Sequence, residues 1–388
     1  MTKAPSVVFA GGGTAGHINP MLAIARALRE LEPNVRILTL GTADKMEAEL
    51  VPAAGFEIEF IPRAPMPRSL SKDTLSFPAK LVGGIKRVAT LLREREADVA
   101  VGVGGYVCSP LYLAAAQAKV PIVIHEANAR PGWANKLGGR FSAFSGVAFA
   151  NTPFKGAQLV GMPMKEEIAH LDRAAQRREA RLRLGLDPDK PTLIVTGGSL
   201  GAASLNKAVA ENIESFAQAN FQVLHITGKT KAILDDAGKP VVAPNYIQIE
   251  FSNGMQDVYA AADLLMVRSG AATVSEIAAV GLPAVFVPLP HGNGEQGLNA
   301  ATLVEAEAAL LVEDSQVTGE WFAQTIPALM NDPQRLEAMA ARAYELGIRD
   351  AAQVMAAKIL ELAREHRAAR DAQEAARDSQ TTTDRKNS

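Results

Sequence analysis

The sequence predicts an α/β protein built from two Rossmann-like domains, each with a parallel sheet, around a deep cleft. A buried strand, a glycine-rich loop and a helix open the chain near Val7, and the same pattern opens again at Thr192. After each opening, short apolar runs alternate with amphipathic ones, which is the pattern of βαβ units and a parallel sheet. A length of 388 residues also suits two domains of ordinary size.

The composition is typical of a globular protein without a membrane span. Hydrophobic residues make up 48% and charged residues 21%, and a formal net charge of −2 gives no basic excess for nucleic acid. The single cysteine, Cys108, excludes an intramolecular disulfide and suits a reducing cytoplasm. The chain enters its first strand without a signal peptide, and no apolar run is long enough to cross a bilayer. We therefore expect a cytoplasmic protein, or one that rests on a membrane surface.

The first glycine loop, residues 11–20, follows the strand at 7–10 and leads into a helix. Its glycines allow backbone N–H groups to approach a phosphate or sugar closely. The spacing resembles a dinucleotide fingerprint, but no acidic residue stands at the expected ribose distance, so the motif is a different one. His17 lies at the helix start, where the positive end of the helix dipole favours the neutral imidazole that can accept a proton. A purely structural role for His17 is the alternative.

Four further strands are expected in the first half, at residues 35–40, 57–61, 98–102 and 121–124. The third leads into a second glycine loop at 102–105, and the fourth ends in a polar cluster of His125, Glu126 and Asn128. Because the carboxyl ends of parallel strands meet at one edge of a sheet, these loops should gather there. Ordinary tight turns are the alternative for each loop.

A Pro-rich basic loop and an amphipathic segment follow the strand at 57–61. The apolar positions of this segment are Leu75, Leu81, Ile85, Val88 and Leu92, beside Lys72, Lys80, Lys86 and Arg87. Apolar residues ringed by Lys and Arg suit an anionic membrane surface. The alternative is a helix that packs on its own sheet.

The second half repeats the opening with a strand at 192–196, a glycine turn at 197–202 and a helix at 204–216, before strands at 221–226 and 246–250. Residues 263–300 then form a strand–helix–strand unit whose helix starts with small and hydroxyl residues. Such a helix start, with free backbone N–H groups, is a phosphate site, and Glu276 one turn further on is well placed for a ribose diol. The alternative is an ordinary βαβ unit capped by Ser and Thr. The polar loop after its second strand, with His291, Asn293, Glu295, Gln296 and Asn299, favours a nucleotide.

Taken together, these motifs resemble those of the MurG family of peptidoglycan glycosyltransferases. The matching segments are GGTAGH (12–17), GVGGY (102–106), HEAN (125–128), GMPMK (161–165), GGSLGA (197–202) and the RSGA-to-Pro283 run that begins at Arg268. The resemblance covers about residues 6–360 and implies the GT-B glycosyltransferase fold. It implies an N-terminal acceptor and membrane-side domain at 1–160, a UDP-sugar domain at 161–345, and a helix at 346–365 that packs back on the first domain. Residues 366–388 are expected to form a frayed or disordered tail.

The resemblance also implies an activity. It is the inverting, metal-independent transfer of N-acetylglucosamine from UDP-N-acetylglucosamine to the 4-hydroxyl of an undecaprenyl-linked muramyl-pentapeptide, lipid I, to give lipid II. No cofactor is expected. An anionic membrane surface and other cell-wall synthesis proteins are the implied partners, and the cytoplasmic face of the cell membrane is the implied location. A related lipid glycosyltransferase, a UDP-N-acetylglucosamine 2-epimerase and a non-catalytic sugar-nucleotide-binding subunit are the alternatives.

Residue by residue, Glu276 corresponds to the ligand of the ribose hydroxyls, and the backbone near Ser252 to the uracil site. The remaining substrate-binding positions carried over are Thr14, Ala15, Gly16, Asn128, Lys165, Ser199, Gly270, Ala271, Ala272, Thr273, Gln296 and Asn299. His17 is the expected general base, with Glu126 and His125 in reserve. The chain departs from the family pattern at Lys165 (commonly Arg), Glu295 (often Gln) and Ala15 (Gly). Asp187-Pro-Asp189 resembles a metal site by its letters but is expected to be a surface turn.

Overall fold

The computed structural model describes residues 3–62, 72–252, 254–291 and 293–386, and its side chains are described except at 72–77, 374–375 and 377–386. The chain divides into two compact units. Unit 1 comprises Met1–Pro163 and Asp350–Ser388, and unit 2 comprises Met164–Arg349. Each unit contains one parallel sheet with helices on both faces, so the prediction of two Rossmann-like α/β domains is confirmed.

Unit 1 has a seven-stranded sheet in the order β3-β2-β1-β4-β5-β6-β7, and every pair of neighbouring strands is parallel. Its elements are β1 (Ser6–Ala10), α1 (Ala15–Leu31), β2 (Arg36–Gly41), α2 (Glu47–Ala53), β3 (Glu57–Phe60), α3 (Lys72–Glu94), β4 (Val99–Gly102), α4 (Cys108–Ala118), β5 (Ile122–Glu126), α5 (Trp133–Gly138), β6 (Phe144–Val147), β7 (Gln158–Leu159) and α14 (Ala351–Lys386). Helices α1 and α14 supply one hydrophobic core, and α3 and α4 supply the core on the other face.

Unit 2 has a six-stranded sheet in the order β10-β9-β8-β11-β12-β13, again parallel throughout. Its elements are α6 (Glu166–Ala169), α7 (Arg173–Arg183), β8 (Thr192–Thr196), α8 (Ala203–Ala210), the 3₁₀ helix η1 (Ile213–Gln218), β9 (Gln222–Ile226), β10 (Tyr246–Ile249), α9 (Met255–Ala261), β11 (Leu264–Val267), α10 (Ala271–Val280), β12 (Ala284–Phe286), α11 (Glu295–Glu305), β13 (Ala309–Leu311), the 3₁₀ helix η2 (Asp314–Gln316), α12 (Gly319–Met330) and α13 (Pro333–Leu346).

Helix α8 and strand β5 end at other residues than the sequence predicts. The helix expected over 204–216 ends at Ala210, because the Asn212 side chain donates to Ala208 O and Gly319 O at 2.9 Å each. This side chain takes the place of the next helical N–H and starts the separate 3₁₀ turn. Strand β5 extends two residues beyond the expected end, and Glu126 pairs with Val147 of β6. The residues expected in a loop after β5 therefore begin inside the sheet.

Helix α14 is anchored to unit 1 by a buried ion pair. Asp98, which is fully buried before β4, accepts from the Arg367 guanidinium through both carboxylate oxygens. Asp98 also accepts from the Ser6 N–H at 2.8 Å, so this carboxylate joins β1, β4 and α14. The helical backbone continues to Lys386 through the segment where we expected a frayed tail from His366.

Candidate functional site

In each unit two glycine loops flank the point where the strand order reverses. In unit 1 the connections of β1 and β4 diverge from that point, and in unit 2 those of β8 and β11 do so. Loops at the carboxyl ends of such a strand pair border a crevice, which is where open α/β sheets bind ligands. The glycine loops predicted at 11–20 and 102–105 occupy these positions in unit 1, where residues 11–14 and 103–107 connect strand to helix. In unit 2 the positions are occupied by residues 197–202 and 268–270.

The start of α10 in unit 2 is an uncapped helix N-terminus. Gly270 is the N-cap residue and has no side chain to bond the first N–H groups, and Ala271, Ala272 and Thr273 form the first turn. Ser269 is fully buried, and among the described residues its Oγ has no hydrogen-bond partner. Free N–H groups at the positive end of a helix attract an anion, so this edge has the features of a phosphate site.

Glu276 lies one turn into α10 and its carboxylate is held in place by Tyr259. The Tyr259 hydroxyl donates to Glu276 Oε2 at 2.6 Å, and Tyr259 is 1% exposed. Burial raises the pKa of Glu276 from 4.5 to about 7, and the hydrogen bond from Tyr259 and the charge of Lys165 partly offset this rise. The Glu276 carboxyl group can therefore gain or lose a proton near neutral pH.

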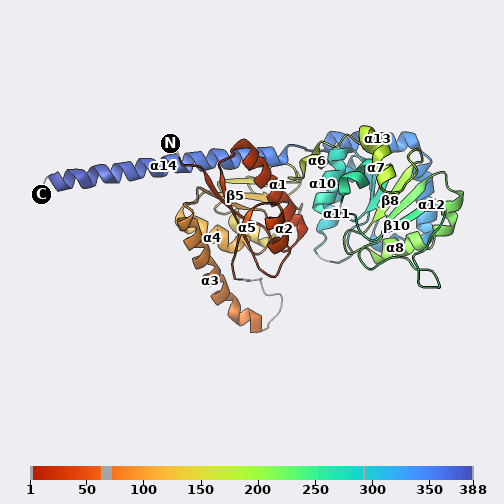
Figure 1. The fold of residues 1–388 in the computed structure, drawn as a ribbon, viewed down its shortest axis with the longest axis horizontal. Coiled ribbons are helices and arrows are strands. Elements are labelled where there is room, and N and C mark those ends of the chain that lie inside the picture. The colour runs from red at the N-terminus through yellow and green to blue at the C-terminus, as the bar shows by residue number, and fades with distance from the viewer. Residues whose placement is uncertain (1–2, 63–71, 253, 292, 387–388) are drawn as a thin grey trace. The chain divides into compact units, whose positions relative to one another are not determined.

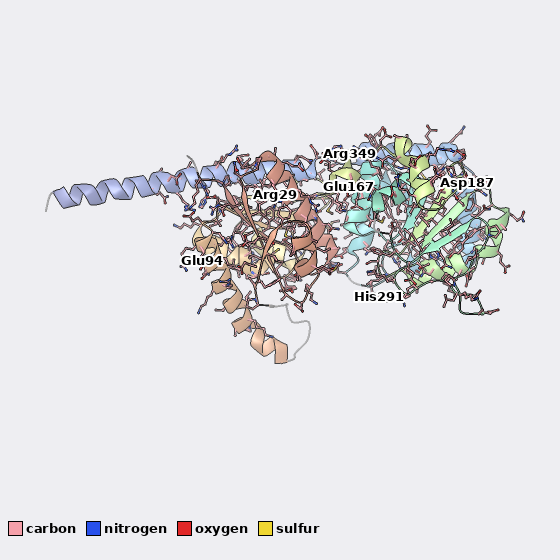
Figure 2. All side chains as sticks on the ribbon, viewed as in Figure 1. Arg29, Glu94, Glu167, Asp187, His291 and Arg349 are labelled. Atoms are coloured by element: carbon pink, nitrogen blue, oxygen red, sulfur yellow. The ribbon has the colours of Figure 1, made fainter. Side chains whose placement is uncertain are left out.

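The other predicted donor-site residues follow strands of the same sheet, with different exposure. Ser199 is exposed in the loop after β8, Ser252 is half-buried after β10, and Gln296 is half-buried in α11. Gln296 accepts from the Leu289 N–H at 2.9 Å, which closes the loop after β12. His291 is exposed in that loop (Figure 2). Asn299 is buried and lies with its Nδ2 3.4 Å from Ser269 O, so it supports the loop before α10 rather than standing in solvent.

The three departures from the family pattern have clear structural settings. Lys165 is the N-cap residue of α6 and donates to Glu167 at 3.3 Å. Ala15 is the first residue of α1 and has no positive φ, so the missing glycine costs no backbone strain there. Glu295 starts α11, and its N–H donates to Asn293 Oδ1 at 3.3 Å.

Arg268 organises this edge of unit 2, a role that the sequence reasoning did not identify. Its guanidinium donates to Pro288 O at 3.0 Å and to Val287 O at 3.2 Å, and it pairs with Asp314 at 2.5 Å. These bonds fix the loop after β12 to the end of β11. The signal was an arginine directly after a buried strand, where a charged side chain must find partners.

In unit 1, His17 lies in the first turn of α1 between the two glycine loops. Its Nδ1 is 3.2 Å from Gly12 O and 3.4 Å from Thr14 Oγ1. The other edge of the ring faces Gly104, where a Cβ atom would come within 2.8 Å of Nε2. Thr14 and Gly16 are exposed, and His17 itself is half-buried.

The two reserve candidates for the base have structural partners instead. His125 is fully buried in β5, its Nε2 lies 2.9 Å from Gly161 O, and burial lowers its pKa to about 4. Glu126 is 3% exposed and accepts from the N–H groups of Asn128 and Gly132 at 2.9 Å each, and from Asn135 Nδ2 at 2.9 Å. Glu126 thus shapes the loop that presents the half-buried Asn128.

Glu47 is a buried carboxylate that the sequence reasoning missed. It is the first residue of α2, is fully buried, and accepts from Gly13 N and Thr42 N in two neighbouring loops. From the sequence it looks like an ordinary acidic residue in the first turn of a short helix. Only the fold brings it beside the first glycine loop.

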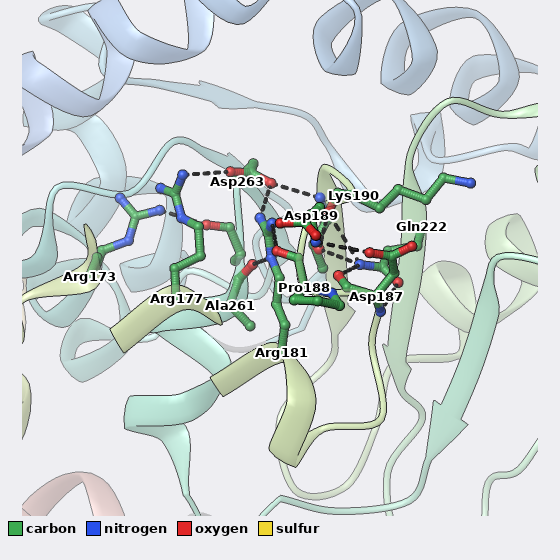
Figure 3. Close-up of polar contacts among 12 residues, drawn as sticks. Arg173, Arg177, Arg181, Asp187, Pro188, Asp189, Lys190, Gln222, Ala261 and Asp263 are labelled. Atoms are coloured by element: carbon green, nitrogen blue, oxygen red, sulfur yellow. Dashed lines mark hydrogen bonds and ion pairs between the residues drawn. The ribbon is translucent and has the colours of Figure 1, made fainter. Parts of the chain in front are cut away.

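The residues Asp187 and Asp189 form a turn that belongs to an arginine network (Figure 3). Asp187 Oδ1 accepts from the Asp189 N–H at 2.9 Å, and Arg178 binds Asp189 at 2.6 Å. In the same network Arg181 pairs with Asp263 at 2.6 Å. Within the described ranges, no group of three or more acidic, His or Cys side chains is placed to hold a metal ion.

The amphipathic segment expected at the membrane is helix α3, which has two different parts. Val88 and Leu92 are buried in the core of unit 1, whereas Leu81 and Ile85 are half-buried. Around these two, Lys80, Lys86 and 49%-exposed Val82 face solvent. The side chains of Lys72, Leu75 and Phe77 lie outside the described residues. No described helix is long and apolar enough to span a bilayer.

Comparison with known proteins identifies both units. Residues 7–144 match the glycosyltransferase family 28 N-terminal domain, and residues 192–355 match the family 28 C-terminal domain. The chain is 53% identical over 360 residues to the UDP-N-acetylglucosamine–N-acetylmuramyl-(pentapeptide) pyrophosphoryl-undecaprenol N-acetylglucosamine transferase of Paenarthrobacter aurescens, covering 93% of this chain and 97% of that one.

Two solved structures share the fold of this chain. The crystal structure of Acinetobacter baumannii MurG has a TM-score of 0.76 and 29% identity, covering 92% of this chain and 99% of that one. The UDP-GlcNAc 2-epimerase of Neisseria meningitidis has a TM-score of 0.63 and 15% identity, covering 92% of this chain and all of that one (100%). This second likeness shows a shared fold alone.

Proposed function

The chain belongs to glycosyltransferase family 28 and to its group of UDP-N-acetylglucosamine–N-acetylmuramyl-(pentapeptide) pyrophosphoryl-undecaprenol N-acetylglucosamine transferases, and from this premise we propose its reaction. It transfers N-acetylglucosamine from UDP-N-acetylglucosamine to the lipid-linked muramyl-pentapeptide, converting lipid I to lipid II. The observation that carries this proposal is the 53% identity that extends over nearly the full length of both chains. At 15% identity, the epimerase likeness gives no comparable support.

Unit 2 binds the donor in this proposal. The uncapped start of α10 at Gly270–Thr273 and the loop around Ser199 hold the diphosphate through backbone N–H groups. Glu276 accepts from the ribose hydroxyls with the carboxylate that Tyr259 orients. Ser252 lies beside the uracil, and Gln296, with the support of Asn299, faces the sugar.

Lys165 adds positive charge near the Glu276 carboxylate and lowers the pKa of Glu276. A lysine in this place acts as a point charge without the fork of an arginine. The helix N-terminus supplies the stabilisation of the leaving UDP, so the mechanism needs no metal.

His17 of unit 1 is the general base that takes the proton of the acceptor hydroxyl. A carbonyl oxygen can only accept, so the contact with Gly12 O favours the tautomer with the ring proton on Nδ1, in which Nε2 is the proton-accepting atom. The accepted proton ends on Nε2 as the acceptor oxygen displaces UDP from the opposite face of the sugar. The loop residues Thr14 to Gly16 and Asn128 line the same edge of the sheet and position substrate.

Helix α3 docks on the cytoplasmic face of the membrane in this proposal, because the lipid chain of the acceptor stays in the bilayer. Lys80 and Lys86 are exposed beside Val82, and each lysine adds about 1 kcal/mol on an anionic surface. Replacing both with Gln should therefore weaken binding to anionic vesicles about 30-fold.

The matched control changes two exposed lysines of unit 2, Lys207 and Lys239, to Gln. Flotation with vesicles of phosphatidylglycerol compares the two double variants. Equal binding by both would show that the α3 lysines do not dock on the membrane.

The proposed reaction is tested with purified full-length chain, radiolabelled UDP-N-acetylglucosamine and lipid-linked muramyl-pentapeptide in anionic vesicles. We expect label in the lipid fraction and one UDP released for each sugar transferred. Conversion of the donor to its 2-epimer without transfer would favour the epimerase instead. Donor binding without either product would indicate a non-catalytic sugar-nucleotide-binding subunit.

A further inference from the structure

A single peptide group lies between the Glu47 carboxylate and His17. The peptide that joins Gly12 to Gly13 donates its N–H to Glu47 Oε2 at 3.0 Å, and its carbonyl oxygen lies 3.2 Å from His17 Nδ1. Because a peptide group is planar, its N–H and its C=O point in opposite directions within one rigid plane. The carboxylate and the imidazole therefore contact opposite sides of the same peptide group.

Glu47 is held rigidly enough to fix the orientation of the Gly12–Gly13 peptide group. Its Oε1 accepts from Thr42 N at 3.2 Å and from Thr42 Oγ1 at 3.0 Å, so the carboxylate is bonded from both sides. The Thr42 hydroxyl proton is used in this way, and the Tyr106 hydroxyl, 2.8 Å away, must then donate to Thr42 Oγ1. The Glu47 network thereby joins the loops after β1, β2 and β4.

The packing leaves little room for the Gly12–Gly13 peptide to move, either on the side of Glu47 or on the side of the second glycine loop. A Cβ atom on Gly12 would lie 2.7 Å from Glu47 Oε1, and one on Gly105 would lie 2.5 Å from Gly12 O. Gly13 has a φ of +90°, a conformation that glycine adopts without strain. Glycines at these positions let the carboxylate and the second glycine loop approach the peptide closely.

We propose that Glu47 is a positioning residue for His17, acting through the Gly12–Gly13 peptide. A carboxylate that accepts from the peptide N–H polarises the peptide and strengthens its carbonyl as an acceptor. The stronger acceptor holds the proton on His17 Nδ1, so that Nε2 is the proton-accepting atom of the ring. When His17 takes the acceptor proton, the same carbonyl stabilises the imidazolium. The kinetic consequence rests on the proposed transferase function, whereas the tautomer can be measured without it.

The direct test is the tautomer of His17, read from nitrogen-15 chemical shifts of histidine-labelled full-length protein. The chain has 6 histidines, and the His17 signals are assigned by their loss in His17→Gln. We expect the neutral wild-type ring to carry its proton on Nδ1, and Glu47→Gln to populate the other tautomer. A wild-type ring protonated on Nε2 would overturn the proposal, even if Glu47→Gln failed to fold.

Kinetics supply the second readout. Glu47→Gln should lower kcat about 10- to 100-fold and leave the donor KM within about twofold. Losses of this size are found when a residue that orients a functional histidine, without contacting the ligand itself, is removed. In a His17→Ala background the same change should cost little more, because both act through one group. The control is Glu49→Gln, which removes an exposed carboxylate from the same helix and should match wild type.

Each outcome separates the inference from the proposed function. Unchanged kcat and tautomer in folded Glu47→Gln would overturn the role of Glu47 and leave the transferase reaction intact. A further loss in the His17→Ala background as large as the loss in wild type would also overturn it. If the wild-type chain transferred no sugar, the proposed function would fail, and the tautomer would still decide whether Glu47 sets the state of His17.

Discussion

The ionisation of Glu276 predicts how donor affinity depends on pH. With a pKa of about 7, the carboxyl group is almost fully ionised at about pH 8.5 and almost fully protonated at about pH 5.5. The ionised form accepts from both ribose hydroxyls through charge-assisted bonds, whereas protonation removes the charge and turns one oxygen into a donor, while Tyr259 already occupies part of Oε2. The apparent dissociation constant equals the intrinsic one divided by the competent fraction, so affinity should fall by up to about 30-fold across this interval, the full value applying when only the ionised form binds.

Calorimetric titration of the full chain with UDP-N-acetylglucosamine measures this effect. The diphosphate diester of this donor does not titrate in the interval, so the change reports on the protein. The control is Glu276→Gln, which keeps an acceptor for Tyr259 and removes the ionisation. At about pH 8.5 this variant should bind the donor at least about tenfold more weakly than wild type, because a hydrogen bond to a charged acceptor contributes about 1.5–3 kcal/mol. Its donor affinity should not change with pH. A flat wild-type profile, or an equal slope in Glu276→Gln, would refute the reasoning.

The same ionisation has a stability consequence of defined sign. The folded state holds the Glu276 proton more tightly than the unfolded chain, in which the pKa is near 4.5. The stabilisation is therefore complete below about pH 4.5 and is lost as pH rises through about 7. The loss amounts to at most about 3 kcal/mol. Urea unfolding of the ligand-free chain should show this loss in wild type and not in Glu276→Gln.

Three further predictions concern other parts of the molecule. Tyr259→Phe removes the hydrogen bond that lowers the pKa of Glu276, so the midpoint of the affinity–pH curve should move to higher pH; an unchanged midpoint would argue against this bond. His17→Ala should lower kcat about 100-fold and leave donor affinity within a few fold; a raised KM with unchanged kcat would make His17 a binding residue instead. Arg367→Ala leaves the buried carboxylate before β4 without its main partner, so urea unfolding should show a loss of about 3 kcal/mol. Arg364 lies on the same helix, is 63% exposed and pairs with Glu32, so Arg364→Ala should cost less than about 1 kcal/mol. Equal losses in the two variants would contradict the role of Arg367.

Much of the fold could be predicted because its signals are local. Alternation of buried runs with amphipathic helices located most strands of the two sheets, and β8 was predicted to the residue. The short strands β6 and β13 were not predicted. The glycine loops were visible because a close approach or a positive φ requires glycine, as at Gly104 and Gly201. The helix break at Asn212 was missed because the side chain bonds a carbonyl at Gly319, far along the chain.

The loops of the candidate site could be predicted from the sequence, whereas the residues that hold the site residues in place could not. Glu276 was singled out by its distance from a helix start, which is a local pattern. Its partner Tyr259 belongs to a different helix, α9, and no spacing rule connects the two. Glu47 likewise acts on loops that only the sheet order brings beside it. Residues that support a site depend on contacts between distant segments, and one sequence contains no direct record of these.

The structure of the reaction product tests the central claim most directly. The full-length chain is incubated with UDP-N-acetylglucosamine and a lipid-linked muramyl-pentapeptide, with and without a chelator, and the disaccharide product is analysed by proton NMR. We expect a β-linked N-acetylglucosamine on the 4-hydroxyl of the muramyl residue, formed equally in both samples. An α-linked product, or one formed only without the chelator, would contradict a single metal-independent displacement.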